Sequence, residues 1–386
     1  MTGKLTLTPV TTPAEREEFI RFQWEIYRND PDWVPPLLSE RREFMDPARH
    51  PFHEHAEVQS YIARRDGRPV GRISAIINHR HNEHWNERVG FFGLYEVVEG
   101  EHEASKALLA AAEDYVRDAG MTAIRGPMNF STNEEIGLLV EGWNGPPVVM
   151  MTYNPRYYVE YIEAAGYAKA MDVFAYLADL RNLREDGTGM NPRLLRVAQK
   201  VQERYNFTVR PINMRNFDEE KQRVKQVYNA AWAKNWGFVP LTVHEMDHLG
   251  EAIKTMIDPK TVFFAEKDGE PIAFMIPFLD LCQPLLKAYP RPGVPEWWTL
   301  LKLGYWWKVR KNVTRLRAAV GGIIEEYRGR GVDAVLFMET LKAGIRGGYE
   351  EFEISWVLEN NIPMRQTAEN FGGEQYRTYR IYEKSL

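Results

Sequence analysis

The sequence has almost no cysteine and no long apolar run. Cys282 is the single cysteine among 386 residues, which excludes an intrachain disulfide and a metal cluster held by several cysteines. No run of about 18 uncharged apolar residues could form a membrane-spanning helix. The first segment, MTGKLTLTPVTTPAEREEF, lacks the apolar stretch of a signal peptide. These absences predict a cytoplasmic protein with no transmembrane span.

An excess of positive charge is missing as well. Lysine and arginine number 49 against 54 aspartates and glutamates, so the formal net charge is -5. Because proteins that bind nucleic acid usually present a basic surface, we expect no nucleic-acid partner. A hydrophobic content of 44% and a length of 386 residues are typical of a soluble globular chain with two domains.

A faint internal repeat supports two domains of one design. YIARRDGRPVGRISAII and VFFAEKDGEPIAFMIPF each place two strand-like runs around an Asp-Gly turn, and Asp66 and Asp268 are 268 − 66 = 202 residues apart. Upstream, DWVPPLLSE and GFVPLTVHE match with an offset of 239 − 34 = 205 between Val34 and Val239. Two landmarks with nearly the same spacing favour a tandem repeat over a chance match of turn motifs.

After its hairpin, each half continues as strand, helix, strand, helix, strand. This order predicts an α/β (α+β) fold in which each domain has a mixed, partly parallel sheet flanked by helices. We expect a first domain over residues 1–180, a linker and helix over 181–204, and a second domain over 205–386. An insertion at about 283–312 separates the second hairpin from its next strand.

A glycine- and arginine-rich turn, YRGRGVDA, follows an apolar strand and opens a helix. Its central residues are Arg328, Gly329, Arg330, Gly331 and Val332. A helix N-terminus presents free N–H groups and the positive end of its dipole, and glycines let a phosphate approach the backbone closely. Strand, turn and helix together predict a phosphate-binding loop, with a solvated basic turn as the alternative.

This loop resembles the cofactor loop of the GNAT superfamily of acyl-CoA-dependent N-acetyltransferases, Arg/Gln-x-x-Gly-x-Gly/Ala, whose first five places Arg328–Val332 fill. The resemblance implies that the loop amides hold the pyrophosphate of acetyl-CoA, or of another acyl-CoA. It also implies that Gly322 and Ile323, at the end of the preceding strand, pair with the pantetheine arm. The later NNIPMRQTAENFGG resembles the next motif of the superfamily, and Asn361 matches the asparagine that opens its helix.

Over its whole length the chain resembles a tandem-GNAT group of bacterial proteins regarded as N-acetyltransferases. The segment RGPMNFSTNEEIGLLVEGWNGPPVVMMTYNPRYY carries that likeness. The resemblance implies acetyl transfer to the amine of a small molecule or peptide. The first half has no glycine-rich loop, so we expect a GNAT-like first domain without a cofactor site and at most one such site, in the second half.

Two residues depart from the superfamily pattern. Asp333 stands where the loop ends in a small residue, and its carboxylate would either repel two phosphate charges or point outward as a favourable first-turn residue. Ala368 stands where many members carry the tyrosine that protonates the leaving thiolate. The alternative function is therefore a non-catalytic ligand-binding or interaction protein on a degenerate GNAT fold.

Acyl transfer to an amine needs a group that accepts a proton, and a carboxylate or a histidine usually does so. Glu325 beside the loop and Glu353 on the next strand are the candidates, and Tyr376 is the candidate acid in place of the missing tyrosine. The structural alternatives are solvated surface charge for the glutamates and strand packing for the tyrosine.

A polar stretch in the first half predicts a substrate site. In GPMNFSTNEEIGLLVEGWNGPP, Asn129, Asn133 and Glu134 follow a strand at a Gly-Pro break, where α/β proteins place ligands. The alternative is a long surface loop capped by its own asparagines and serines.

A further motif, VHEMDHLG, contains His244, Glu245 and His248 in the His-Glu-x-x-His spacing of zinc hydrolases. This spacing gives a third functional hypothesis. Thr242 and Glu245 also form a Thr-x-x-Glu capping box, which explains the glutamate without a metal. We therefore expect no metal site.

The insertion is rich in tryptophan and basic residues. It holds Trp297, Trp298, Trp306 and Trp307, together with Lys302, Lys308, Arg310 and Lys311. A basic aromatic helix is typical of peripheral contact with a membrane surface or of a cover over an acyl site. Packing of the tryptophan rings into the core is the alternative.

Overall fold

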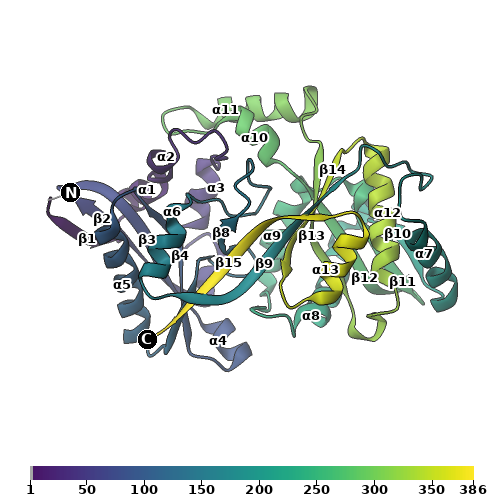
Figure 1. Ribbon diagram of the computed structural model, residues 1–386, viewed down its shortest axis with the longest axis horizontal. Helices are drawn as coiled ribbons and strands as arrows, with labels where there is room; N and C mark the ends of the chain where they lie inside the picture. The colour runs from purple at the N-terminus through teal and green to yellow at the C-terminus, as the bar shows by residue number, and fades with distance from the viewer. Residues whose placement is uncertain (1–2) are drawn as a thin grey trace. The chain divides into compact units, whose positions relative to one another are not determined.

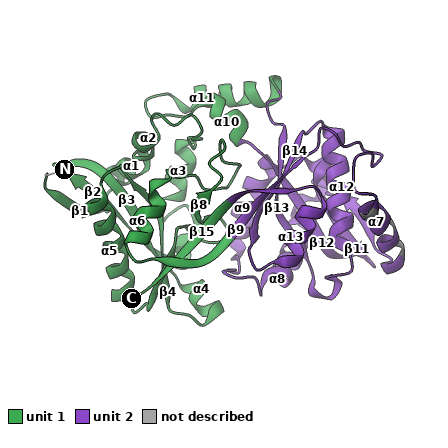
Figure 2. Cartoon of the chain, viewed as in Figure 1, with its two compact units in different colours: residues 1–172, 282–310, 378–386 green, residues 173–281, 311–377 purple. Residues whose placement is uncertain are grey.

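The computed structural model describes residues 3–386, and the chain folds into two compact units (Figure 2). Unit 1 comprises Met1–Asp172, Cys282–Arg310 and Thr378–Leu386, and unit 2 comprises Val173–Leu281 and Lys311–Arg377. None of the helices formed by residues 3–386 has the length and apolar character that crossing a membrane requires.

Unit 1 contains a mixed sheet with one parallel pair of strands (Figure 1). Its strands are β1 (Leu5–Pro9), β2 (Ala56–Arg65), β3 (Arg68–Asn78), β4 (Val89–Val97) and β5 (Ala123–Gly126), with the end of β15 (Glu374–Ser385) beside β5. Only β4 and β5 run parallel among these pairs. The shorter strands are β6 (Met128–Asn129), β7 (Glu135–Ile136) and β8 (Leu138–Glu141).

The helices of unit 1 include one long amphipathic helix that packs in the core of the unit. They are α1 (Pro13–Arg21), α2 (Gln23–Ile26), α3 (Leu38–Phe44), η1 (Pro51–Glu54), α4 (His79–Trp85), α5 (His102–Asp118), α6 (Tyr157–Ala164), α10 (Cys282–Ala288), α11 (Glu296–Gly304) and η4 (Tyr305–Val309). In α5, Leu108, Ala112 and Val116 recur every fourth residue and are fully buried, because this spacing puts them on one helix face against β3 and β4.

Unit 2 repeats this design. Its strands are β10 (Thr208–Pro211), β11 (Phe263–Lys267), β12 (Glu270–Leu279), β13 (Arg315–Ile323) and β14 (Glu351–Leu358), with the end of β9 (Ala168–Asp179) beside β14. Its helices are α7 (Pro192–Tyr205), η2 (Met214–Asn216), α8 (Phe217–Trp232), α9 (Val243–Met256), η3 (Pro259–Thr261), η5 (Glu325–Tyr327), α12 (Val332–Gly347) and α13 (Ile362–Asn370). The parallel pair is β13 and β14.

The two Asp-Gly turns have the backbone that the sequence predicts. In the hairpin of β2 and β3, Asp66 and Gly67 have φ of 50° and 81°, and in that of β11 and β12, Asp268 and Gly269 have 53° and 85°. Two successive residues with positive φ form the turn that matches the twist of a hairpin. The mixed α/β class with flanking helices is thus confirmed.

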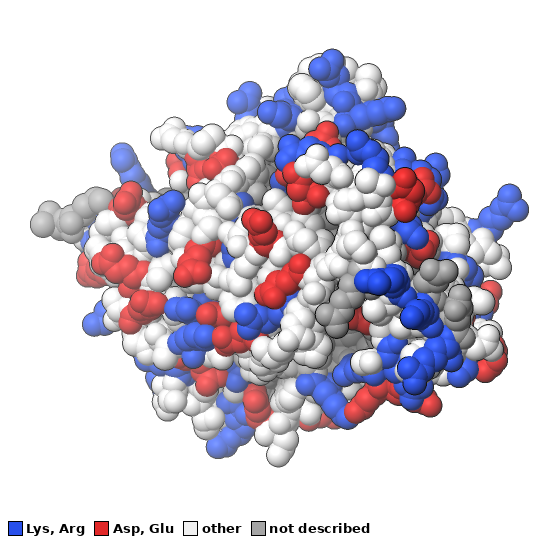
Figure 3. Space-filling model, turned by 45° about the vertical axis from the view of Figure 1, so that its right-hand side comes forward, with Lys and Arg blue, Asp and Glu red and all other residues white. Residues whose placement is uncertain are grey.

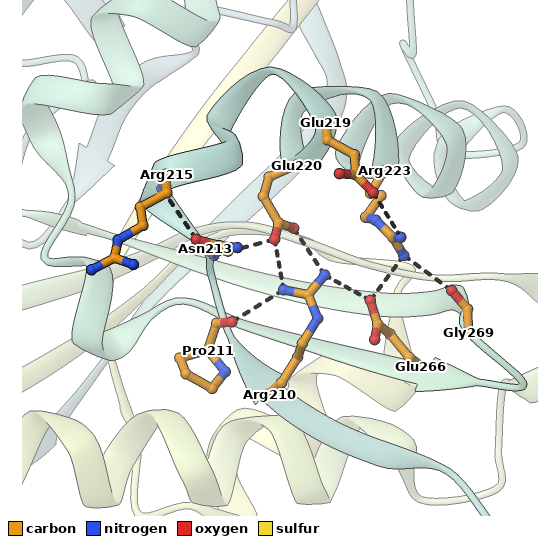
Figure 4. Close-up of polar contacts among 9 residues, drawn as sticks. All are labelled: Arg210, Pro211, Asn213, Arg215, Glu219, Glu220, Arg223, Glu266 and Gly269. Atoms are coloured by element: carbon orange, nitrogen blue, oxygen red, sulfur yellow. Dashed lines mark hydrogen bonds and ion pairs between the residues drawn. The ribbon is translucent and has the colours of Figure 1, made fainter.

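An ion-pair network fixes the start of α8 to the sheet of unit 2 (Figure 4). The Arg210 guanidinium donates to both carboxylate oxygens of Glu220, at 2.7 and 3.1 Å, and to Glu266 at 2.7 Å. Arg223 donates to Glu266 at 2.9 Å and to the Gly269 carbonyl at 3.1 Å. Because Glu220 is almost fully buried, its charge needs these partners.

The terminal strand of each unit comes from the other half of the sequence. In unit 1, β15 pairs antiparallel with β5 from Tyr382↔Gly126 to Ser385↔Ala123. In unit 2, β9 pairs antiparallel with β14 from Asp179↔Glu351 to Val173↔Leu358. The units therefore differ from the expected division at 1–180, 181–204 and 205–386. The segment Cys282–Arg310, most of the insertion expected at about 283–312, belongs to unit 1. Element order along the chain does not reveal which strand a terminal strand will join.

The pairing of β15 with β5 predicts that the C-terminal strand stabilises unit 1. Tyr382 is 1% exposed and lies in the core of that unit. Tyr382→Ala should lower the free energy of unfolding by about 3–5 kcal/mol, because it leaves a cavity under the strand. Hydrogen exchange should also accelerate in β5.

Glu374→Ala is the matched control, since Glu374 is exposed on the same strand. Denaturant unfolding and exchange mass spectrometry measure both effects. Equal stability of the two variants, with β5 protection unchanged, would contradict the importance of this pairing.

Candidate functional site

The parallel strands β13 and β14 separate at their carboxyl ends. Their ladder runs from Arg315↔Glu351 to Ala318↔Ile354, although β13 continues to Ile323 and β14 to Leu358. After a register shift, β14 remains paired on its other side with β9, through Val357↔Phe174. The carboxyl ends of parallel strands that part in this way are where α/β proteins bind ligands.

A β-bulge in β13 accompanies this separation. Ile276 of β12 lies opposite Val320 and Pro277 opposite Ala318, so Ala319 is an extra residue in β13. A bulge turns the strand and changes which residues face its neighbours, and bulges are frequent beside active sites. The end of β13 is therefore turned at the point where its ladder with β14 stops.

The glycine-rich loop lies at the same end of β13. After Ile323 the chain forms η5 and the loop, and α12 begins at Val332. Gly329 and Gly331 have φ of 68° and 82°, which side-chain-bearing residues rarely adopt. Because Gly331 is the N-cap and carries no side chain, it cannot cap the first N–H groups of α12. The loop thus has the backbone geometry that a phosphate site needs.

The two loop arginines contact the protein itself. The Arg328 guanidinium donates to the Ile323 carbonyl at 3.2 Å and to the Ala231 carbonyl. Arg330 lies over the rings of Tyr205 and Tyr327, 5.5 and 5.3 Å from their centroids. Their assignment to a pyrophosphate stays a prediction. In this structure both arginines contact the protein itself, so the backbone N–H groups of the loop are the better candidates to donate hydrogen bonds to a phosphate.

Side chains bind the backbone carbonyls on the edge of β13 that faces away from β12. The Ile324 N–H donates to Ile272 of β12 at 3.0 Å, so alternation puts the backbone groups of Gly321 and Ile323 on the side away from β12. There the Trp232 indole donates to the Gly321 carbonyl at 2.9 Å, in addition to the bond from Arg328 to Ile323. The N–H groups of this edge are what a ligand would pair with. Gly322 itself faces α8, since an added Cβ would lie 3.2 Å from Ala231.

The two residues that depart from the superfamily pattern have structural contacts. Thr367 of α13 donates a hydrogen bond to the Asp333 carboxylate at 3.1 Å, so this half-buried side chain has a partner in α13. Ala368 is fully buried and offers no proton donor. Asn361 caps α13, because its side chain accepts the Met364 N–H at 3.3 Å. Its role toward a cofactor stays a prediction.

A buried carboxyl lies next to the last rungs of the β13–β14 ladder. Glu353 is 0% exposed, accepts from Ser355 Oγ at 2.7 Å and accepts from the Tyr376 hydroxyl at 3.3 Å. Arg317 Nε lies 3.8 Å from this carboxylate and donates to Ser355 Oγ at 2.9 Å. Burial raises the pKa of Glu353, and the Arg317 charge opposes this rise. Two of the three predicted catalytic residues, Glu353 and Tyr376, are thus brought together.

The third candidate has surface surroundings. Glu325 is exposed, and Lys234 Nζ donates to both of its carboxylate oxygens at 2.8 Å. The Lys234 ammonium lowers the pKa of Glu325, which weakens it as a proton acceptor. The sequence did not single out Arg317 or Ser355. A charged residue inside the apolar strand RLRAAVGGII was the signal for Arg317, because a buried charge needs a partner.

Unit 1 fills the corresponding place with its own residues. The ladder of β4 and β5 ends at Phe91↔Arg125, and β4 has an extra residue between Gly93 and Glu96. The Asn129 side chain accepts the Leu94 N–H at 2.8 Å, and an added Cβ on Gly93 would lie 1.8 Å from the Met128 carbonyl oxygen. The segment after β5 therefore packs directly on β4.

The other residues of the predicted substrate site bind within their own loop. Glu134 accepts the N–H groups of Phe130 and Ser131 at 2.6 and 3.2 Å, and the Asn133 N–H donates to Ser131 Oγ at 3.2 Å. His50 Nε2 lies 3.4 Å from the Glu134 carboxylate. These contacts match the alternative of a self-capped loop. The substrate role of Asn129, Asn133 and Glu134 stays a prediction.

The glutamate of the zinc-like motif caps its own helix. Glu245 N–H donates to Thr242 Oγ1 at 3.0 Å, and the Glu245 carboxylate accepts the Thr242 N–H at 2.7 Å. Both bonds of a capping box are present at the start of α9. Among the side chains that the structure describes, no group of three or more histidines, cysteines or carboxylates could hold a metal ion.

Comparisons with solved structures define the class of the fold. A tandem GNAT protein from the clavulanic acid biosynthesis pathway covers 99% of this chain with a TM-score of 0.56 at 14% identity, over 98% of its own length. A GCN5-related N-acetyltransferase from Sphaerobacter thermophilus gives a TM-score of 0.53 at 12% identity, over 99% of this chain and 95% of its own. The chain has the fold of these GNAT proteins, as its sequence predicts.

Full-length relatives define the family more narrowly. The bacterial ceramide synthase of Caulobacter vibrioides is 37% identical over 388 residues, covering 99% of this chain and 98% of that protein. Protein YghO of Escherichia coli is 33% identical over 373 residues, covering 95% and 92%. This chain belongs to the family of these two proteins. No family model matches the sequence.

The opposite surroundings of Glu353 and Glu325 predict opposite effects of pH on stability. The raised pKa of Glu353 means that the folded state binds its proton more tightly than the unfolded state does. The contribution of Glu353 to the free energy of unfolding therefore falls as pH rises from about 4.3, the usual glutamate pKa, through the raised pKa. Glu353→Gln should therefore lose less stability than wild type over that range.

Glu325→Gln is the matched control with the reverse sign. Because the pKa of Glu325 is lowered, its ionised form stabilises the fold at pH values above the usual glutamate pKa, and this stabilisation is lost as pH falls. The variant should therefore lose less stability than wild type on acidification. Denaturant unfolding over a pH series compares the slopes. Parallel curves for wild type and Glu353→Gln would refute the raised pKa.

Proposed function

We propose that this protein is an acyl-CoA-dependent N-acyltransferase that acylates the amino group of a long-chain amino alcohol. The observation that carries the proposal is in unit 2, where the end of the β13–β14 ladder adjoins the buried Glu353 and Tyr376 and the loop at Arg328–Gly331 follows β13. A ceramide is the fatty acyl amide of a long-chain amino alcohol. Kinship with a bacterial ceramide synthase therefore supports this product class over acetylation of a small amine or peptide.

The residues present fit an acyl-CoA. The uncapped N–H groups at the start of α12 and the positive φ of Gly329 and Gly331 suit a pyrophosphate. The N–H groups of Gly321 and Ile323 would donate hydrogen bonds to the carbonyls of a pantetheine arm, because side chains already bind the backbone carbonyls of these two residues. Such a cofactor would supply an acyl group activated as a thioester.

Amide formation makes a C–N bond, breaks the C–S bond of the thioester and moves one proton from the amine to the leaving thiolate. Glu353 supports the proton transfers, because burial raises its pKa above the usual value and so makes the carboxylate a stronger proton acceptor. The Tyr376 hydroxyl donates to Glu353 Oε1 at 3.3 Å and so links the carboxylate to the less buried phenol.

Arg317 and Ser355 position the carboxylate. Ser355 Oγ donates to Glu353 Oε2 at 2.7 Å and itself accepts from Arg317 Nε at 2.9 Å. These bonds leave Oε1 for the tyrosine and hold the side chain in one orientation. The nearby positive charge also keeps the ionised form accessible inside a buried environment.

Release of thiol from palmitoyl-CoA with sphinganine as acceptor tests the proposal. Wild type should release thiol and form the amide, and Glu353→Gln should lower kcat about 10²–10⁴-fold, because general acid–base catalysis is lost. Glu325→Gln should remain as active as wild type, since Glu325 is an exposed, ion-paired residue. Mass spectrometry of the lipid product identifies the amide.

Three results would overturn the proposal. Acyl-CoA binding without thiol release from any donor would favour a non-catalytic ligand-binding protein, the alternative that Asp333 and Ala368 raised. Thiol release with acetyl-CoA and small amines but not with sphinganine would replace the acceptor class. Turnover lost on chelation and restored by zinc would favour the hydrolase hypothesis at His244 and His248.

A further inference from the structure

One helix of unit 1 turns its apolar face outward. In α11 and η4 the exposed fractions are 63% for Trp297, 49% for Trp298, 47% for Leu300, 60% for Leu301, 47% for Tyr305 and 68% for Val309. In α11 and the first residue of η4, Trp297, Leu300, Leu301 and Tyr305 follow the spacing of a single helix face. We call these six residues the α11 surface. An amphipathic helix normally buries such a face, so its exposure needs an explanation.

The opposite face fastens the helix to unit 1. Thr299 is buried, and Lys302 Nζ donates to the Ala288 carbonyl at the end of α10 at 2.7 Å. The Glu296 carboxylate accepts from the Ser39 N–H at 3.0 Å and from the Ser39 hydroxyl. Core packing, the alternative for the tryptophans of this insertion, is thus wrong for Trp297 and Trp298. The helix is fixed by its polar face and presents its apolar face.

Positive charge adjoins the α11 surface. Lys308 lies in η4, Arg310 and Lys311 directly follow η4, and all three are exposed. Between residues 296 and 311, Glu296 is the single acidic residue in the sequence, and Ser39 already binds it. Lysine and arginine side chains gather at the top of the view in Figure 3, where Figure 1 draws α11. This local sign is opposite to the chain's net charge of -5.

We propose that the α11 surface inserts into the headgroup region of an anionic lipid bilayer. Tryptophan and tyrosine favour that region because their rings are apolar with one polar group, and the leucines extend toward the acyl chains. The adjoining cations match anionic headgroups, which attract a basic segment by about 1 kcal/mol per charge. This charge complementarity selects a lipid surface over an apolar protein partner. The inference goes beyond the proposed function and needs no acyl transfer.

Cosedimentation of the full-length protein with vesicles tests it, using phosphatidylcholine alone or mixed with phosphatidylglycerol. Wild type should bind the mixed vesicles more tightly. Trp297→Ser/Leu301→Ser should weaken binding at least about tenfold on both, because two anchoring side chains are lost. Lys308→Gln/Lys311→Gln should weaken binding to the mixed vesicles on the order of 30-fold and leave binding to phosphatidylcholine unchanged.

Val243→Ser is the matched control, since Val243 is 60% exposed on α9 and should not affect binding. Thermal unfolding checks that each variant is folded. Failure of wild type to bind either vesicle, or equal binding by Trp297→Ser/Leu301→Ser, would overturn the proposal. A wild-type dimer that this variant converts to a monomer would also overturn it, because a second copy would then cover the α11 surface. Because the assay contains no acyl-CoA, its outcome is independent of catalysis.

Discussion

The site in unit 2 depends on one constraint, that a strand leaving its neighbour must keep its backbone hydrogen bonds elsewhere. Strand β14 meets this constraint because Val357 and Leu358 pair with β9 after the ladder to β13 has ended. On the other side, β13 keeps β12, and the extra residue Ala319 turns it at the point of separation. Each strand therefore stays in the sheet while the two part.

The same strand design gives a different result in each unit. In unit 1, Asn129 and Met128 lie against the bulged part of β4, so protein groups occupy the place beside this strand. In unit 2, a loop with two glycines of positive φ and an uncapped helix start follows the bulged strand. One fold thus supports a filled place in one unit and a candidate site in the other, which is why fold similarity alone does not give function.

Burial distinguishes the two candidate acidic residues of unit 2. Glu325 lies beside the loop and Glu353 on the next strand, yet Glu353 is fully buried and Glu325 is exposed and paired with Lys234. The protein environment raises the pKa of Glu353 and lowers that of Glu325. In the same way, the exposed tryptophans of α11 gain significance from where the fold puts them, since tryptophan in a sequence more often indicates core packing.

Local patterns determined much of this protein from the sequence alone. The Asp-Gly pairs fixed two hairpins because few residue pairs accept two successive positive φ values. The glycines of YRGRGVDA indicated the loop, and Thr242 with Glu245 indicated a capped helix, because each depends on neighbours within a few residues. The tertiary structure alone decided the rest. Which half supplies the terminal strand of each unit, which glutamate meets Tyr376, and which helix face stays exposed all depend on contacts between residues far apart in the chain, and spacing along a sequence does not encode those distances.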